Sequence, residues 1–290
     1  MQINGKIISE KIFDHLKSEI KKNHLKPKLV VFGVNPKDQD LSFIKAKEKA
    51  CTKIGAEFEL VLFKKALRFE EFAKKIKSIS QKEDVTAIII QKPLPSSLNS
   101  VTLFNYIHDT KEIEGHKKKS PFVAPIGLAV LSVIKSAYAP KKNLDKYLVN
   151  FNKDIAFFKN IFKKKRVVIV GRGETGGMPI GDTFSRMKIN YISINSKTPD
   201  PNQFLKKADF IISAVGQKVI MSADIKSGAF LISIGIRKDN DQWQGDYDEM
   251  DIKNIASIYT PTPGGIGPVD IAYLMYNLVS AAKLQKQEDY

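Results

Sequence analysis

Cysteine is almost absent from this sequence of 290 residues, which holds Cys51 alone. A single thiol excludes an intrachain disulfide and a cysteine-based metal cluster, and it favours a reducing cytoplasm. Long apolar runs are also missing, because residues 1–9 lack the apolar core of a signal peptide and no run approaches the roughly 20 residues of a membrane span. Histidine is scarce, and no metal-ligand spacing connects the four that occur, His15, His24, His108 and His116. We therefore expect a cytoplasmic protein without a metal site or a membrane partner.

Arginine is rare as well, although the chain is strongly basic. Lys and Arg number 47 against 31 Asp and Glu, a formal net charge of +16, yet the arginines are only Arg68, Arg166, Arg172, Arg186 and Arg237. Recognition of phosphate and guanine prefers the guanidinium fork. We therefore interpret most lysines as solvated surface and expect no nucleic-acid partner. The chain is 43% apolar and 27% charged, so it can bury a sizeable core, and its length favours two domains.

Helix-like and strand-like segments alternate along both halves of the chain. In the first half, helical spacing and strand patterns alternate over 3–20, 29–34, 42–55, 57–63, 69–79 and 86–90. In the second half, four apolar runs (VVIV, YISI, FIISAV and FLISIGI) lie between 167 and 236 with helix-length gaps. This alternation predicts an α/β protein with two parallel sheets, the second doubly wound. We interpret 137–165, rich in lysine and aromatics without a strong period, as a helical connector, and 271–284 as an amphipathic helix.

A glycine fingerprint follows the VVIV run directly. Gly171, Gly173 and Gly176 form a GxGxxG between a predicted strand and a predicted helix, the context in which such a loop binds pyrophosphate at a helix N-terminus. A merely structural glycine turn is the alternative. About 20 residues on, where an NAD site places an acid, the chain has Ser196 and Lys197 instead. Together with Arg172 these side chains suit a 2′-phosphate and favour NADP, unless Lys197 is one more surface lysine.

Lys47 stands out on the predicted helix over 42–55. At about 100° per residue it falls inside an apolar arc with Phe43, Ala46 and Ala50. Partial burial of an ammonium lowers its pKa and lets the free amine act as a base. The alternative is that Lys47 snorkels along the apolar stripe, and periodicity does not separate the two.

Two proline-containing segments end predicted strands. Gln91-Lys92-Pro93-Leu94-Pro95 follows TAIII, which places Gln91 at the carboxyl end of a sheet, where open α/β folds bind ligands. The segment TPTPGGIGP over 260–268 combines rigid prolines with bare glycines. Either segment on its own is equally consistent with a rigid loop.

Taken together, the chain resembles the bifunctional methylenetetrahydrofolate dehydrogenase/methenyltetrahydrofolate cyclohydrolase family. The resemblance runs in order over nearly the whole chain, through INGK, IIIQKPLP, KEIEG, GRGETGGMP, SKT, ADFIISAVG, GD and TPTPGGIGP. It implies an N-terminal α/β catalytic domain and a Rossmann-type dinucleotide-binding domain with a cleft between them, usually in a dimer. It also implies a folate-binding domain over 1–136 joined by the C-terminal helix 271–290, the connector 137–165, and an NADP-binding domain over 166–270.

The resemblance further implies the chemistry and its residues. Members oxidise 5,10-methylenetetrahydrofolate with NADP to the methenyl form, then hydrate it to 10-formyltetrahydrofolate. Lys47 corresponds to the general base, Gln91 to the glutamine that tunes it, and Glu114 to the acid that binds the pterin. Substrate contacts correspond to Phe43, Pro263, Gly264, Gly265 and Asp270. Cofactor contacts correspond to Gly171, Arg172, Gly173, Gly176, Ser196, Lys197, Ala214, Gly216 and Ile236.

Several positions depart from the family pattern. The family tyrosine four residues before the lysine is Phe43 here, so the ring stays and the hydroxyl is lost. The family aspartate is Glu114, and Lys92 replaces a leucine. We therefore expect an NADP-dependent dehydrogenase with cyclohydrolase activity, and weigh against it a dehydrogenase whose cyclohydrolase is weakened or lost. A hypothesis of another class is a non-catalytic nucleotide- or nucleic-acid-binding protein.

Overall fold

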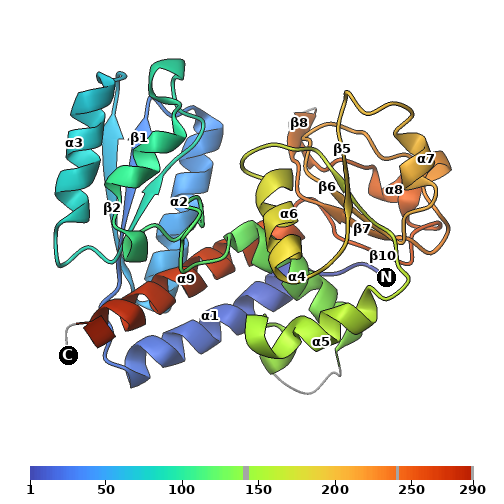
Figure 1. Ribbon diagram of the computed structural model, residues 1–290, viewed down its shortest axis with the longest axis horizontal. Coiled ribbons are helices and arrows are strands. Elements are labelled where there is room, and N and C mark those ends of the chain that lie inside the picture. The colour runs from blue at the N-terminus through green and yellow to red at the C-terminus, as the bar shows by residue number, and fades with distance from the viewer. Residues whose placement is uncertain (140–143, 240–241, 289–290) are drawn as a thin grey trace. The chain divides into compact units, whose positions relative to one another are not determined.

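The computed structural model describes residues 1–139, 144–239 and 242–288 and divides the chain into two compact units (Figure 1). The five-strand unit comprises Met1–Lys11 and Ile126–Asp270, and the three-strand unit comprises Ile12–Pro125 and Ile271–Tyr290. The predicted two-domain α/β class with parallel sheets is confirmed. The boundaries of these units differ from those of the predicted domains. That one domain binds folate and the other binds NADP stays a prediction. The predicted cleft also stays a prediction.

The three-strand unit is built on the parallel sheet β2-β1-β3. Its strands are β1 (Lys28–Val34), β2 (Glu57–Phe63) and β3 (Ala87–Ile90), and its helices include α2 (Asp38–Ile54) and α3 (Phe69–Ser80). The chain steps from β1 to β2 on one side and then crosses to β3 on the other, so right-handed crossovers place α2 and α3 on opposite faces of the sheet (Figure 1). Short 3-10 helices follow β3: η1 (Ser96–Leu98), η2 (Val101–Tyr106) and η3 (Asp109–Lys111).

The core of this unit follows from the alternation of β1. Val30 and Phe32 point to the face covered by α3, where Phe32 and Phe72 pack edge to face with ring centroids 5.7 Å apart. β2 forms one edge of the sheet, and Leu60 and Leu62 on it remain exposed. The carboxyl ends of β1 and β3 lie side by side at one edge of the sheet, because Phe32 pairs with Ile90.

The five-strand unit holds a parallel sheet in the order β10-β7-β6-β4-β5. Its strands are short and mostly buried: β4 (Val167–Val170), β5 (Ile192–Ile194), β6 (Phe210–Ser213), β7 (Phe230–Ser233) and β10 (Ile258–Tyr259). Its helices are α6 (Gly177–Arg186), α7 (Asn202–Leu205) and α8 (Glu249–Ile252), with η5 (Ser222–Asp224) and an antiparallel pair, β8 (Arg237–Asp239) and β9 (Gln242–Gln244). In chain order this sheet is 2-1-3-4-5, so the direction of winding reverses between β4 and β6, the point where such folds bind ligands.

Most of the predicted connector packs on this sheet. Its residues 140–143 lie outside the described residues, while α5 (Phe151–Ile161) and the preceding α4 (Pro125–Tyr138), which the sequence analysis does not predict, are regular helices. Between them lies the short η4 (Leu144–Lys146). Lys135 on α4 and Asp154 on α5 form a buried ion pair of 2.6 Å, and the ring centroids of Phe162 and Phe210 are 4.9 Å apart. The five-strand unit therefore includes both helices.

Two long helices continue from one unit into the other. α1 (Gly5–Lys22) leaves the five-strand unit after Lys11, and α9 (Ile266–Glu288) leaves it after Asp270. Residues 289–290 of the predicted C-terminal helix lie outside the described residues. The prediction of an amphipathic helix is wrong, because the four consecutive residues 272–275 are all buried and lie on all sides of α9. None of the helices among the described residues combines the length and the apolar character needed to cross a bilayer.

Candidate functional site

Lys47 and Gln91 meet at the carboxyl edge of the three-strand sheet. α2 buries the stripe Asp40, Ile44, Cys51 and Ile54, and Lys47 lies half-buried on that stripe, one turn after Ile44. Gln91 follows the last residue of β3, and its Oε1 accepts a 2.7 Å hydrogen bond from Lys47 Nζ. The Gln91 amide is fixed in turn, because its Nε2 donates to the Lys92 carbonyl at 2.7 Å. The amine is therefore held at a defined place by a neutral acceptor.

The predicted apolar arc of α2 is partly wrong. Phe43 is 38% exposed, so it does not belong to the buried face, although Ala50 does. The stripe is rotated toward Ile44 and Cys51, because these side chains fill the space against the sheet and against Met275 of α9, whose Sδ lies 3.6 Å from Cys51 Sγ. Phe43 instead presents an exposed ring one turn before Lys47.

Glu114 lies on a tight turn tied together by Glu112. The Glu112 carboxylate is buried and accepts hydrogen bonds from the backbone N–H of Glu114 and of His116, both at 2.9 Å. His116 Nδ1 lies 3.5 Å from Glu112 Oε1. The Glu112 backbone pairs with Ile88 of β3, so the turn is anchored to the strand that ends at Gln91. Sequence reasoning missed Glu112 and His116, because their roles arise from contacts within the turn.

The charges around this turn influence one another. Burial raises the pKa of Glu114, and the positive charges of His116 and Lys47 oppose that rise. Burial disfavours the charged form of His116, but its hydrogen bond to Glu112 and the charge of Glu114 outweigh burial, so the pKa of His116 is raised. Glu114, Lys47 and His116 therefore form one electrostatic cluster at this edge.

The glycine loop lies at the carboxyl end of β4, beside the point where the winding reverses. Gly171 has φ +100°, and a Cβ there would lie 2.7 Å from the Ala214 carbonyl oxygen. A Cβ on Gly177, the first residue of α6, would lie 1.9 Å from the Gly171 carbonyl oxygen. Gly173 is different, because a Cβ there would have no described atom within 4 Å. The close packing of this loop therefore requires glycine at positions 171 and 177. The GxGxxG fingerprint includes Gly171 but not Gly177.

Asp246 orders the loop that faces the glycine loop. Its buried carboxylate accepts backbone hydrogen bonds from Val215 at 3.0 Å, Gly216 at 2.8 Å and Gln217 at 3.1 Å. Ser213 Oγ on β6 adds a fourth hydrogen bond to this carboxylate at 2.7 Å. The loop therefore holds the predicted cofactor residues Ala214 and Gly216 in a fixed shape. Asp246 itself is not among the predicted site residues, and its position in the GD motif was the available signal.

The remaining predicted cofactor residues follow β4, β5 and β7. Arg172 is exposed and donates from Nη2 to the Ser193 carbonyl of β5 at 2.6 Å. Lys197 N–H donates to Asn195 Oδ1 at 3.0 Å in a turn that carries Ser196 between them. The Ile236 carbonyl oxygen would lie 3.3 Å from a Cβ on Gly216. All of these residues come after carboxyl ends of parallel strands, so they gather at one edge of the five-strand sheet.

The proline-glycine segment over 260–268 belongs to the same unit. Thr260 is buried and accepts through its carbonyl a 2.6 Å hydrogen bond from Tyr247 Oη. Gly264 accepts a 2.9 Å hydrogen bond from Gly5 N–H, so the INGK motif braces the loop. Pro263, Gly264 and Gly265 precede α9, and Asp270 lies on its second turn.

The predicted site residues thus divide between the units. Lys47, Gln91, Glu114 and Phe43 belong to the three-strand unit, whereas the predicted cofactor residues and the predicted substrate residues 263–265 and 270 belong to the five-strand unit. Within the three-strand unit the structure brings Lys47 and Gln91 into contact and places Glu114 within reach of the charge of Lys47.

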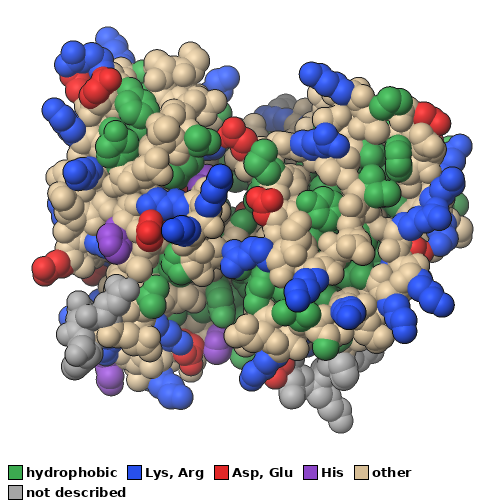
Figure 2. Space-filling model, in the orientation of Figure 1, with side chains coloured by type: hydrophobic (Ala, Val, Ile, Leu, Met, Phe, Trp, Pro, Cys, Tyr) green, Lys and Arg blue, Asp and Glu red, His purple; other side chains and the backbone are tan. Residues whose placement is uncertain are grey.

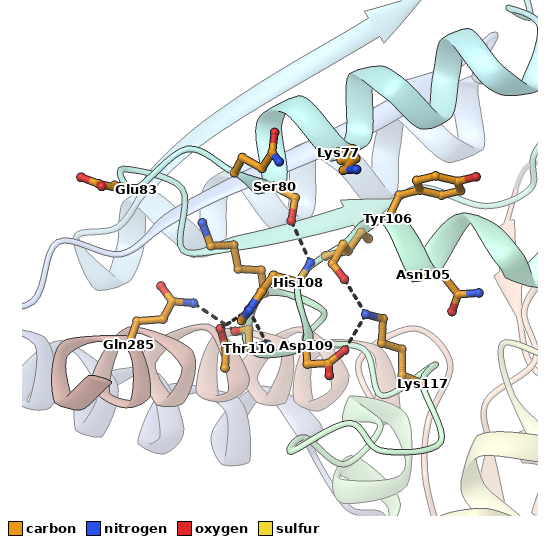
Figure 3. A pocket seen from close by; sticks show the side chains of 13 residues that line it. Lys77, Ser80, Glu83, Asn105, Tyr106, His108, Asp109, Thr110, Lys117 and Gln285 are labelled. Atoms are coloured by element: carbon orange, nitrogen blue, oxygen red, sulfur yellow. Dashed lines mark hydrogen bonds and ion pairs between the residues drawn. The ribbon is translucent and has the colours of Figure 1, made fainter. Parts of the chain in front are cut away.

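A large hollow of the three-strand unit does not coincide with these residues. It has a volume of about 930 Å³ and is lined by polar side chains such as His108, Lys117 and Gln285 (Figure 3). The residues that line it come from the end of α3, the segment over 105–111 and α9. Lys117, which also lines it, forms an ion pair with Asp109 at 2.6 Å. None of the predicted site residues lines this hollow. Lys and Arg side chains are spread over the visible surface of both units (Figure 2).

Comparisons with known proteins give matches over most of the chain. Residues 3–114 match the family model described as tetrahydrofolate dehydrogenase/cyclohydrolase, catalytic domain, and residues 155–286 match the model of the NAD(P)-binding domain of the same family. The bifunctional protein FolD of Hydrogenobaculum sp. (strain Y04AAS1) is 33% identical over 292 residues, covering 97% of this chain and 98% of that protein. FolD of Lysinibacillus sphaericus (strain C3-41) is 31% identical over 288 residues, covering 97% and 96%.

A solved structure shares the fold. The bifunctional FolD methylenetetrahydrofolate dehydrogenase/cyclohydrolase of Campylobacter jejuni superposes with a TM-score of 0.85 at 24% identity, covering 98% of this chain and 99% of that one. At 24% sequence identity this similarity is evidence for a shared fold and not for a shared activity.

Proposed function

Because the chain belongs to the tetrahydrofolate dehydrogenase/cyclohydrolase family, we propose that it oxidises 5,10-methylenetetrahydrofolate with NADP and hydrolyses the product to 10-formyltetrahydrofolate. The observation that carries the proposal is the 2.7 Å hydrogen bond from Lys47 to Gln91. A half-buried amine held by a neutral amide at the carboxyl edge of a parallel sheet is placed where such folds bind their ligands. Tetrahydrofolate derivatives are the proposed partners.

In this proposal Lys47 is the general base of the hydration step. The amine takes a proton from the water that attacks the methenyl carbon, and positioning of such a base contributes about 100-fold to 10,000-fold to a rate. Gln91 orients the amine through its Oε1, and its own Nε2 is occupied by the Lys92 carbonyl, so the amide cannot rotate without losing a bond. Support for the assignment comes from the exposure of Lys45 and Lys49 on the opposite side of the helix.

The proposal also assigns residues to folate binding. The Glu114 carboxylate accepts hydrogen bonds from the pterin, and the exposed ring of Phe43 stacks on it. Pro263, Gly264 and Gly265 provide a bare backbone surface for the substrate, and Asp270 provides a polar contact. The turn at Glu112 supports the assignment of Glu114 to the pterin. The Glu112 carboxylate accepts hydrogen bonds from the backbone N–H groups of Glu114 and His116, which hold the backbone at Glu114 in place.

The residues of the glycine loop fit a dinucleotide. Gly171, Gly173 and Gly176 lack a Cβ, so a ligand can approach the backbone at the start of α6 closely, and a side chain at Gly171 or Gly177 would collide with neighbouring backbone. Arg172, Ser196 and Lys197 supply two cations and a hydroxyl for a 2′-phosphate, while Ala214, Gly216 and Ile236 line the facing loop. NADP, when bound, accepts the hydride. The protein's own part is to bind and orient the dinucleotide.

A coupled assay tests this function. Purified protein is mixed with 5,10-methylenetetrahydrofolate and either NADP or NAD, and NADPH or NADH formation is followed separately from loss of the methenyl absorbance band. We expect NADP to give the higher kcat/KM. We expect Arg172→Ala to raise the KM for NADP roughly tenfold, as for loss of one charge-assisted hydrogen bond, and to leave the KM for NAD unchanged. No reduction of either dinucleotide would refute the proposal.

A second candidate function is dehydrogenase activity alone, with the cyclohydrolase activity weakened or lost. The specific observation is Phe43, which lacks the hydroxyl of the family tyrosine one turn before Lys47. Accumulation of methenyltetrahydrofolate in the assay above, with NADPH formed at a normal rate, is the result that favours this candidate.

We further propose a homodimer in the cytoplasm. Support for the dimer comes from Leu60 and Leu62, which are 37% and 46% exposed on the edge strand β2. Unpaired apolar edge strands are otherwise a liability for a protein chain. Light scattering at micromolar concentration tests the dimer, with Leu62→Lys as the variant expected to give monomer. Support for the cytoplasm comes from the single buried thiol of Cys51.

A further inference from the structure

His116 has no part in the reaction proposed above, yet its side chain is held from two sides. Its Nδ1 lies 3.5 Å from the buried Glu112 carboxylate, and its ring centroid lies 4.0 Å from that of Phe104 on η2. The side chain is only 23% exposed. The imidazole therefore lies between the Glu112 carboxylate and the Phe104 ring.

The same carboxylate fixes the backbone that carries Glu114. Glu112 is 1% exposed, and its two oxygens accept the backbone N–H groups of Glu114 and His116. A buried carboxylate is costly unless it is paired and hydrogen-bonded. The His116 side chain completes the pairing of Glu112, so the position of Glu114 and the charge of His116 depend on one another.

The charged groups that act on this turn come from three elements. Glu112 and Glu114 lie on the turn itself, Lys92 comes from the loop after β3, and Lys47 comes from α2. Lys92 Nζ lies over the Phe104 ring at 5.6 Å from its centroid, on which His116 also packs.

We propose that His116 is a positioning residue of the folate site: held by Glu112 and Phe104, it fixes the turn that presents Glu114 and places a positive charge beside that carboxylate. This inference rests on the proposed function for the role of Glu114. Its consequence is that the Glu114 carboxylate stays ionised, and able to accept hydrogen bonds from the pterin, at a lower pH than burial alone would allow.

Two complementary variants separate the charge of His116 from its packing. His116→Phe keeps a ring against Phe104 and removes the charge, whereas His116→Lys keeps a charge and removes the ring. For each variant, kcat/KM for methylenetetrahydrofolate is measured from pH 5 to pH 9 at saturating NADP. His108→Asn is the matched control, because His108 lies on the same unit among Ser80 and Thr110, and asparagine still caps η3.

We expect the acid limb of the profile to move up by about one pH unit in His116→Phe, since a neighbouring charge shifts a carboxyl pKa by that order. On the acid limb that shift lowers kcat/KM by up to about tenfold, because one unit is a tenfold change in the ionised fraction of a carboxyl well below its pKa. On the plateau above the limb the variant and the wild type are expected to agree within about twofold. In His116→Lys and His108→Asn the acid limb of the pH profile is expected to stay at its wild-type position.

A readout without substrate keeps this inference separate from the proposed function. The ¹³C carboxyl resonance of Glu114, assigned by its loss in Glu114→Gln, is titrated in the wild type and the variants. A higher midpoint in His116→Phe alone supports the inference even if the enzyme reduces no dinucleotide. An unchanged midpoint, or an equal fall in kcat/KM at every pH, overturns it and leaves His116 with a packing role only.

Discussion

The edge of the five-strand sheet that carries the glycine loop is made of backbone, whereas the matching edge of the three-strand sheet is made of charged side chains. At the first edge, Gly171 and Gly177 approach one another closely, and Asp246 holds the facing loop through three backbone N–H groups. At the second edge, the side chain of Lys47 binds that of Gln91, and the side chain of Glu112 pairs with that of His116.

This difference determines what the departures from the family pattern are expected to change. A loop made of backbone needs only small residues at close approaches, so many side chains around it are free to change. A cluster of charges depends on every member, because each one alters the pKa of the others. Phe43, Lys92 and Glu114, the departures nearest to the proposed chemistry, all lie in the three-strand unit. The consequence is that cofactor binding withstands sequence change better than the folate chemistry does.

The largest effect is expected at Lys47. Lys47→Met removes the proposed base and is expected to lower the hydration rate by roughly 100-fold or more, while the hydride step keeps much of its rate. The two steps are measured separately by methenyl absorbance and NADPH formation. Lys45→Met, an exposed neighbour on α2, is the control and is expected to change neither. Equal loss of both steps would assign Lys47 to folding or binding instead.

A smaller effect is expected in the glycine loop. In Gly177→Ala the new Cβ would lie 1.9 Å from the Gly171 carbonyl oxygen, so loop and helix must separate. A displacement of about 1 Å costs up to 100-fold in a positioned reaction, and we expect the KM for NADP to rise by at least tenfold. Gly173→Ala meets no described atom within 4 Å and is expected to keep the wild-type melting temperature. Equal melting temperatures for the two variants would argue against close packing of backbone at this edge.

Asp246→Asn tests the other half of the same edge. Loss of the charge weakens three backbone hydrogen bonds, which is expected to lower the free energy of unfolding by about 1–3 kcal/mol and to raise the KM for NADP several-fold. Chemical denaturation and initial rates give the two values. Asp182→Asn on the exposed side of α6 is the control. A variant with full stability and a changed KM would show that Asp246 contacts the dinucleotide directly.

The smallest effect is expected at Phe43. Phe43→Tyr restores a hydroxyl one turn before Lys47, and one net hydrogen bond of about 0.5–1.5 kcal/mol corresponds to a gain of roughly two- to tenfold in hydration. The ratio of hydration to hydride transfer is the measurement, and it cancels errors in enzyme concentration. A fall in this ratio would mean that the pocket has adapted to the phenylalanine.

Buried strands and motif positions were the predictable parts of this fold. β1, β4, β6 and β7 begin within one residue of their predicted starts, because buried parallel strands appear as short apolar runs between turn residues. The helix over Pro125–Tyr138 was missed, since a helix that is apolar on nearly all sides has no period. The start of α9 was misplaced because Pro268 suggested a loop, although proline is tolerated in the first turn of a helix.

The site was predictable only as far as motifs reach. The strand pattern predicted Gln91 at the carboxyl end of a sheet, whereas helix spacing predicted only that Lys47 is partly buried, and the association of the two residues came from the resemblance. The pairing of Glu112 with His116 was not predictable, since it depends on side-chain rotamers in a turn without regular structure. Asp246 was missed although it lies in the GD motif, because the backbone N–H groups that it binds lie about 30 residues away in the chain.

The routes of α1 and α9 have a consequence for how the protein is made on the ribosome. The five-strand unit needs Gly5, which hydrogen-bonds to Gly264, and the three-strand unit needs Asn277, which hydrogen-bonds to the Ile113 carbonyl. Neither unit therefore has all of its segments until almost the whole chain has been synthesised. Both units include residues of α9, so a chain truncated before this helix would leave both units incomplete.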